Sequence, residues 1–116
     1  MSKTLEESFK EWEASIYGLD SCMCSYKCAV GIAANMHKSL RARRNDIDQL
    51  DKDGTQWTDR KSERMRVFTC LLTELDKFLM ASAAVDYKRY YEQLFWVKSY
   101  FCLLGTMIGC STTLFY

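Results

Sequence analysis

Three cysteines are the first residues whose types and spacing could do chemistry. Cys22, Cys24 and Cys28 form a C-x-C-x3-C pattern, and cysteine thiolates are common zinc ligands. A structural zinc site needs four ligands, usually from two closely spaced pairs, and this sequence has no second pair. The single histidine, His37, would lie about 13 Å from Cys28 along a continuous helix, which is too far to share a metal ion. We therefore expect no bound metal and no other cofactor.

The run from Asp51 to Gly54 has the acidic residues and the glycine of a calcium-binding loop, but the flanking residues do not fit one. With Gly54 at loop position 6, Gln49 takes position 1 and Arg60 takes position 12, where a bidentate glutamate is required. A polar, glycine-containing run of this kind is typical of a tight turn. We interpret it as the turn of a helical hairpin.

Recognisable catalytic motifs are missing from the sequence. It has one histidine, no glycine-rich phosphate loop, no G-x-S-x-G and no H-E-x-x-H, the patterns that mark many hydrolases, kinases and metalloproteases. A cysteine–histidine pair would depend on proximity in the fold, which the sequence does not show. We predict that the protein is not an enzyme.

The composition is that of a small helical domain. The chain has 116 residues, a net charge of +1, 48% hydrophobic residues, five glycines and no proline. This length predicts a single domain over residues 1–116, and the scarcity of helix breakers favours an all-α fold. Residues 1–15 are acidic and amphipathic rather than a secretory signal, so we expect a cytoplasmic protein whose six cysteines are reduced.

Apolar residues at helical spacing predict a small helical bundle, with a short first helix and three longer ones joined by coiled-coil-like seams. The first helix is expected over residues 4–17, with an apolar face of Leu5, Phe9, Trp12 and Ile16, and it should end in the polar turn that begins at Gly18. The second helix is expected over residues 21–50, on a seam of Cys22, Tyr26, Ala29, Ala33, Met36, Leu40, Ile47 and Leu50. Only Arg43 interrupts this seam, and its guanidinium should snorkel to water or pair with an acid from another helix or subunit.

Two further helices are predicted after the hairpin turn. Thr58 is a suitable N-cap for the third helix, whose seam would be Met65, Phe68, Leu72, Leu75 and Leu79. The seam of the last helix would be Tyr87, Tyr90, Leu94, Val97, Phe101, Leu104 and Ile108. We expect a turn at residues 81–86, because a hairpin covers apolar faces better than an extended rod. The alternative is one long helix, since these residues contain no strong breaker.

The last helix is apolar nearly all round. Side chains that lie off its seam include Phe95, Trp96, Tyr100, Leu103 and Met107. A helix of this kind needs cover on more than one side. We therefore predict a protein–protein interaction module, an adaptor or inhibitor that acts by binding, which forms a homo-oligomer through these five residues.

A membrane anchor is one alternative. Residues 99–116 carry no charge, and Gly105 and Gly109 form a G-x-x-x-G pattern that allows close helix contact in membranes. On this hypothesis a tail-anchored protein would insert through residues 94–116. The polar residues in the stretch favour a different interpretation, a final helix buried in the fold with a glycine notch for a crossing neighbour.

Nucleic-acid binding is a second alternative. Residues 38–66 contain nine basic and six acidic residues, a net charge of +3, whereas residues 1–20 contain two basic and five acidic residues, a net charge of −3. A helical hairpin would bring Arg41 and Arg44 to a similar height as Arg60 and Arg64, where they would contact phosphates. The interleaved acidic residues favour a solvated helix surface with ion pairs instead.

Overall fold

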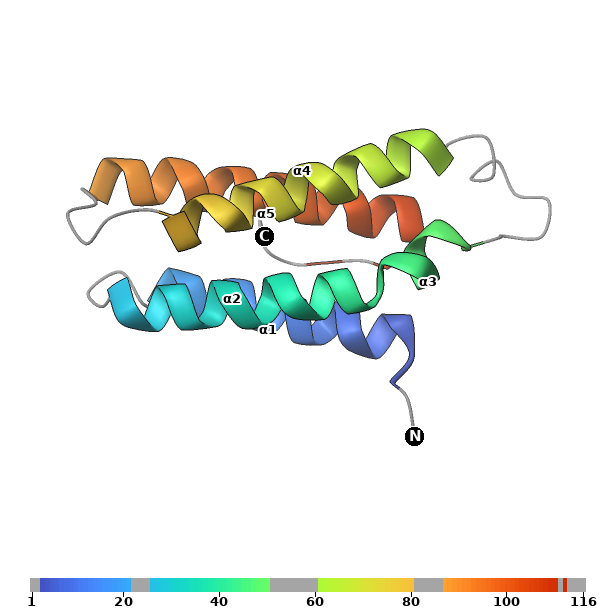
Figure 1. The fold of residues 1–116 in the computed structure, drawn as a ribbon, viewed down its shortest axis with the longest axis horizontal. Helices are drawn as coiled ribbons and strands as arrows, with labels where there is room; N and C mark the ends of the chain where they lie inside the picture. Colours follow the sequence, from blue (N-terminus) through green and yellow to red (C-terminus); the bar gives the residue numbers. More distant parts are fainter. Residues whose placement is uncertain (1–2, 22–25, 51–60, 81–86, 111, 113–116) are drawn as a thin grey trace.

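The computed structural model describes residues 3–21, 26–50, 61–80, 87–110 and 112, and in these ranges the chain forms helices and no strand (Figure 1). The helices are α1 (Leu5–Ser21), α2 (Tyr26–Ala42), α3 (Arg44–Asp48), α4 (Lys61–Met80) and α5 (Tyr87–Ile108). The prediction of an all-α bundle is therefore confirmed.

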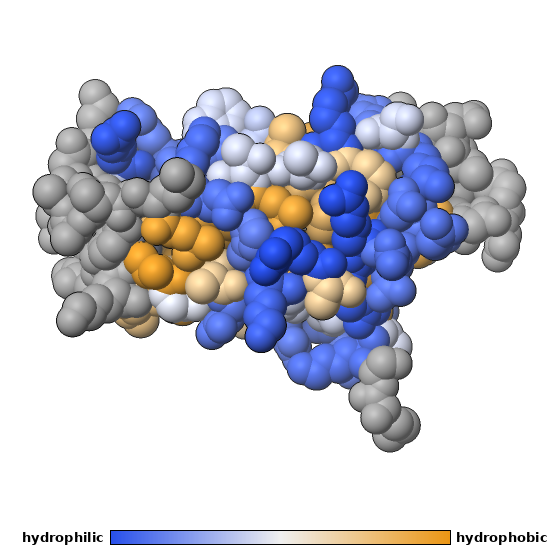
Figure 2. Space-filling view, in the orientation of Figure 1, coloured by the Kyte–Doolittle hydropathy of each residue, from blue (hydrophilic) through white to orange (hydrophobic). Residues whose placement is uncertain are grey.

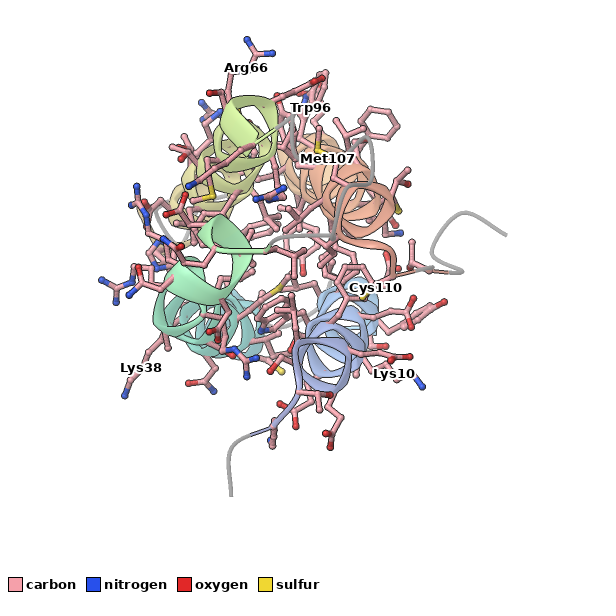
Figure 3. The ribbon with its side chains drawn as sticks, turned by 90° about the vertical axis from the view of Figure 1, so that its right-hand side faces the viewer. Lys10, Lys38, Arg66, Trp96, Met107 and Cys110 are labelled. Carbon is pink, nitrogen blue, oxygen red and sulfur yellow. The ribbon has the colours of Figure 1, made fainter. Side chains whose placement is uncertain are left out.

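The four long helices form an antiparallel bundle in which neighbours in the chain are also neighbours in space. α1 packs on α2, α2 on α4, α4 on α5, and α5 returns to α1. Figure 1 shows α1 and α2 in one layer and α4 and α5 in the other, and Figure 3 looks along the helices. The short helix α3 extends α2 at one end and packs on α4.

Three of the predicted seams form the core. The buried residues of α1 include Phe9, Trp12 and Ile16, those of α2 are on the predicted stripe, and α5 buries Tyr90, Leu94, Val97, Phe101, Leu104 and Ile108. The rings of Phe9 and Phe101 stack with centroids 4.2 Å apart, which joins the first helix to the last. α1 is longer than predicted, because Leu19 continues its seam and is fully buried, so Gly18 does not end the helix.

The continuous second helix predicted over residues 21–50 is wrong, because the helix breaks at Arg43. This residue has φ −103° and ψ 11°, between the end of α2 and the start of α3. Its Nη1 donates hydrogen bonds to the Lys3 carbonyl at 2.7 Å and to Ser8 Oγ at 3.2 Å, and its Nε lies 2.6 Å from Asp46 Oδ2. The guanidinium therefore ties the start of α1 to the corner between α2 and α3 instead of snorkelling to water.

α4 buries a different stripe from the predicted one. Phe68 and Leu75 are buried as expected, but Met65, Leu72 and Leu79 are only partly buried. The buried residues also include Arg64, Val67, Leu71, Glu74 and Phe78. α4 contacts α2, α3 and α5, and its inward face includes the two charged residues Arg64 and Glu74, which a purely apolar stripe leaves out.

The predicted turns lie outside the described residues, but the helices that they would join are described. The turn at residues 51–54, the Thr58 cap and the turn at residues 81–86 all lie outside the described residues. α4 and α5 lie side by side and run in opposite directions (Figure 1), so the alternative of one long rod is wrong.

The end of α5 confirms the predicted glycine notch. A Cβ atom on Gly105 would lie 2.5 Å from Phe9 Cζ and 2.8 Å from the Cys110 carbonyl oxygen, so only glycine fits against α1 here. Gly109 has φ +79°, and the Cys110 N–H donates a 2.8 Å hydrogen bond to the Gly105 carbonyl, as in a Schellman C-cap. Among the described residues, no helix has the length and hydropathy needed to cross a membrane.

Candidate functional site

The outward side of α5 carries most of the exposed large hydrophobic residues of the described chain. The described residues include five exposed large hydrophobic side chains. Four of them belong to α5: Tyr91 (50%), Phe95 (54%), Trp96 (48%) and Leu103 (46%). The fifth is Tyr17 of α1. We call Tyr91, Phe95, Trp96 and Leu103 the outer face of α5.

The rings on and beside this face contact one another. Phe95 and Trp96 meet edge to face with centroids 5.5 Å apart, and Trp96 stacks on the half-buried Tyr100 at 6.0 Å. Aromatic side chains have few rotatable bonds, and contacts between them restrict those further. Binding through this face would therefore cost little conformational entropy.

The outer face of α5 has charged residues only near its N-terminal end. From Gln93 to Cys110 the sole charged residue is Lys98, whose Nζ lies 2.8 Å from Asp20 Oδ2 of α1 and whose side chain is 18% exposed. Arg89 and Glu92 are exposed one or two turns before Trp96. Beyond Glu92, the outer face of α5 therefore carries no charged residue.

A polar groove borders this stripe on the side of α4. It has a volume of about 390 Å³ and is lined by Glu74, Lys77, Arg89, Glu92, Gln93, Trp96 and Tyr100. The Glu74 carboxylate accepts hydrogen bonds from Gln93 Nε2 and, at 3.1 Å, from Lys77 Nζ. The groove is lined by two acidic and two basic residues, so their charges balance. It is therefore better suited to the polar rim of a binding surface than to a strongly charged ligand.

The predicted interaction residues of the last helix only partly coincide with this face. Phe95, Trp96 and Leu103 lie on it, and Tyr100 stacks beneath Trp96. Met107 differs from the expectation, because it is 3% exposed and lies between α4 and α5 (Figure 3). Tyr91 was not predicted, although its four-residue spacing from Phe95 places both on one side of a helix.

The predicted basic surface is not assembled as expected. Arg41 and Arg44 are exposed, but Arg64 is 1% exposed and lies inside the fold, and Arg60 lies outside the described residues. Lys38 and Arg66 extend from the bundle in different directions (Figure 3). Hydrophilic residues on the side formed by α2 and α4 alternate with apolar surface (Figure 2).

Arg64 has a structural role instead. Its Nε donates a 2.9 Å hydrogen bond to the Ile47 carbonyl, and its Nη2 donates to the carbonyls of Asp48 at 3.2 Å and Leu50 at 3.3 Å. Carbonyls at a helix C-terminus have no partner within the helix and carry partial negative charge. The guanidinium therefore joins α4 to the end of α3.

The residues considered for metal or thiol chemistry do not come together in the described parts of the chain. His37 Nε2 lies 3.0 Å from Asp76 Oδ1 on α4, whereas Cys28 is exposed on α2. Cys22 and Cys24 lie outside the described residues, within which no three metal-ligating side chains cluster. Burial, reinforced by the nearby Glu13 carboxylate, raises the pKa of the Cys102 thiol, so this cysteine is a poor nucleophile at neutral pH.

Comparison of the chain with family models, with curated proteins and with solved structures finds no match.

Proposed function

We propose that this protein is a non-enzymatic, cytoplasmic interaction module, an adaptor or inhibitor that acts by binding and self-associates through the outer face of α5. The observation that carries the proposal is the concentration of half-exposed Tyr91, Phe95, Trp96 and Leu103 on one helix. Exposed aromatic residues of this kind are typical of the centres of protein interfaces, where charged residues are depleted.

The size of the face supports the proposal. Three half-exposed aromatic side chains and a leucine present on the order of 400 Å² of surface. The largest apolar patch of a monomeric protein usually measures about 300–600 Å² and often has a function. A stable dimer buries about 800 Å² on each partner, of which the apolar centre is only a part. The outer face of α5 therefore suits the centre of a dimer interface of ordinary size.

The opposite side of α5 holds the helix rigidly in place. Phe101 stacks on Phe9, Gly105 fits against the same ring, and the buried Tyr90 hydroxyl donates a 2.5 Å hydrogen bond to the Leu19 carbonyl. A surface carried by a fixed helix needs little rearrangement on binding. The contacts with α1 thus fix the position of α5, so its outer face would bind a partner with little rearrangement.

The proposal is tested by replacing Trp96 with glutamate and measuring mass by light scattering after size exclusion. We expect the unmodified chain to exceed its monomer mass of 13.6 kDa and Trp96→Glu to fall to that mass, because a buried carboxylate opposes association. Asn35→Glu adds the same single negative charge at an exposed position of α2 and should behave like the unmodified chain. A Trp96→Glu variant that associates as the unmodified chain does would count against the outer face of α5.

A further inference from the structure

We infer that two copies of the chain pair through antiparallel α5 helices, with a two-fold axis passing close to Ser99. This inference rests on the proposed self-association and adds the arrangement of the two copies. It follows from the order of residues along the outer face of α5 and from the position of the charges at its N-terminal end.

Two of the four side chains of the outer face of α5, Phe95 and Leu103, are placed symmetrically about Ser99. Phe95 precedes Ser99 by four residues and Leu103 follows it by four, and both are about half exposed. Around a two-fold axis at Ser99, the Phe95 of each copy therefore lies opposite the Leu103 of the second copy. These two positions therefore complement each other across the axis, as a two-fold interface requires.

The small side chain of Ser99 allows the helices to approach closely at the axis. The axes of packed helices usually lie about 8–10 Å apart, and small residues at the crossing point allow the shorter distances. Larger side chains on either side then fill the space between the diverging helices. Ser99 is partly exposed on the outward side, so the crossing point is accessible to a second copy.

The charges on α5 favour the antiparallel arrangement over the parallel one. In a parallel pair, Arg89 would lie next to Arg89 of the second copy and Glu92 next to its Glu92, so like charges would repel. In the antiparallel pair, Arg89 comes opposite Gly109, because each is ten residues from Ser99. Residues 99–110 carry no charge, and the C-terminal end of a helix attracts a cation.

A charge exchange on the full chain tests this arrangement. Phe95→Lys alone and Leu103→Glu alone each place an unpaired charge in the interface, and each should raise the dissociation constant at least about thirtyfold. The double variant Phe95→Lys with Leu103→Glu would place lysine opposite glutamate twice in an antiparallel dimer. We expect it to bind at least about fivefold more tightly than either single variant.

A mixture of Phe95→Lys and Phe95→Glu chains serves as the matched control, because it places lysine opposite glutamate only in a parallel dimer. Recovery by the double variant, without recovery by this mixture, supports the antiparallel pair. Recovery by the mixture, or no recovery by the double variant, overturns it. An unmodified chain that stays monomeric refutes the proposed self-association itself, so the two failures are distinguishable. Circular dichroism of each variant checks that the helices are retained.

Discussion

At the scale of single residues, Arg64 shows why residue type alone misled the sequence analysis. Its position in a basic run of the sequence indicated a solvated cation, yet its side chain is among the most deeply buried in the described chain. The three carbonyls that it contacts become available only when α3 ends beside α4. A pattern along one helix does not show where a neighbouring helix ends, so this role was not predictable.

Replacement of Arg64 with methionine should lower the free energy of unfolding by about 2–4 kcal/mol. Methionine fills part of the volume but leaves the buried Ile47 carbonyl and the partly buried Asp48 and Leu50 carbonyls without their donor. Arg66→Met on the exposed side of the same helix is the control, and it should change stability by less than about 0.5 kcal/mol. Urea unfolding followed by circular dichroism measures both. Equal effects of the two substitutions would contradict the role given to Arg64.

The start of α1 gives a prediction about pH. The Thr4 N–H and hydroxyl donate hydrogen bonds to Glu7 Oε1 at 3.2 and 3.0 Å, and the Glu7 N–H donates to Thr4 Oγ1 at 3.1 Å. The hydrogen bonds from Thr4 lower the pKa of Glu7. Ionised Glu7 therefore stabilises the helix above the pKa that it has in the unfolded chain, and this contribution is lost as pH falls through the lower, folded value.

Thr4→Ala removes the hydroxyl partner and should shift the Glu7 pKa upward. The change can be followed by an NMR titration of the Glu7 side chain in both proteins. An unchanged titration midpoint would show that the Thr4 hydroxyl does not stabilise the carboxylate. The T-x-x-E spacing of this capping box is readable from the sequence, and it would have placed the helix start correctly.

At the scale of helices, spacing predicted some elements well and others poorly. α1, α2 and α5 each have one dominant apolar stripe, so their buried faces followed from the 3.6-residue period. The buried stripe of α4 is shifted from the predicted one and includes Arg64 and Glu74, which a hydrophobic pattern does not mark as buried. The break at Arg43 depends on atoms of Lys3 and Ser8, forty and thirty-five residues away, and a local pattern does not contain that information.

Two glycines in different helices provide a paired test of the packing. Gly105→Ala should destabilise the fold by about 1–3 kcal/mol, because the added methyl group would collide with Phe9 and the Cys110 carbonyl. Gly31→Ala should stabilise it by about 0.5–1 kcal/mol, because Gly31 is exposed within α2 and nothing lies within 4 Å of its added Cβ. Thermal unfolding of both variants checks the opposite signs. Destabilisation by Gly31→Ala would contradict the open surface at that position.

At the scale of the whole molecule, the bundle explains why α5 has two apolar sides. Each long helix contacts two other long helices, and the rest of its surface faces outward. α1 and α4 cover that part with mainly polar residues, whereas α5 leaves Tyr91, Phe95, Trp96 and Leu103 exposed. The sequence predicted an excess of apolar residues in this helix. The sequence did not show that Met107 would be buried and Tyr91 exposed. Which residues of α5 face outward depends on how the helix is rotated between α1 and α4.

Sedimentation equilibrium of the unmodified chain tests the central claim most directly, which is that the outer face of α5 joins two copies. The measurement should span about a hundredfold range of concentration, so that a change from monomer to dimer with a micromolar dissociation constant is visible. We predict a mass that rises with concentration from 13.6 kDa toward twice that value, and a flat 13.6 kDa for Trp96→Glu. A flat 13.6 kDa for the unmodified chain over the whole range would contradict the claim.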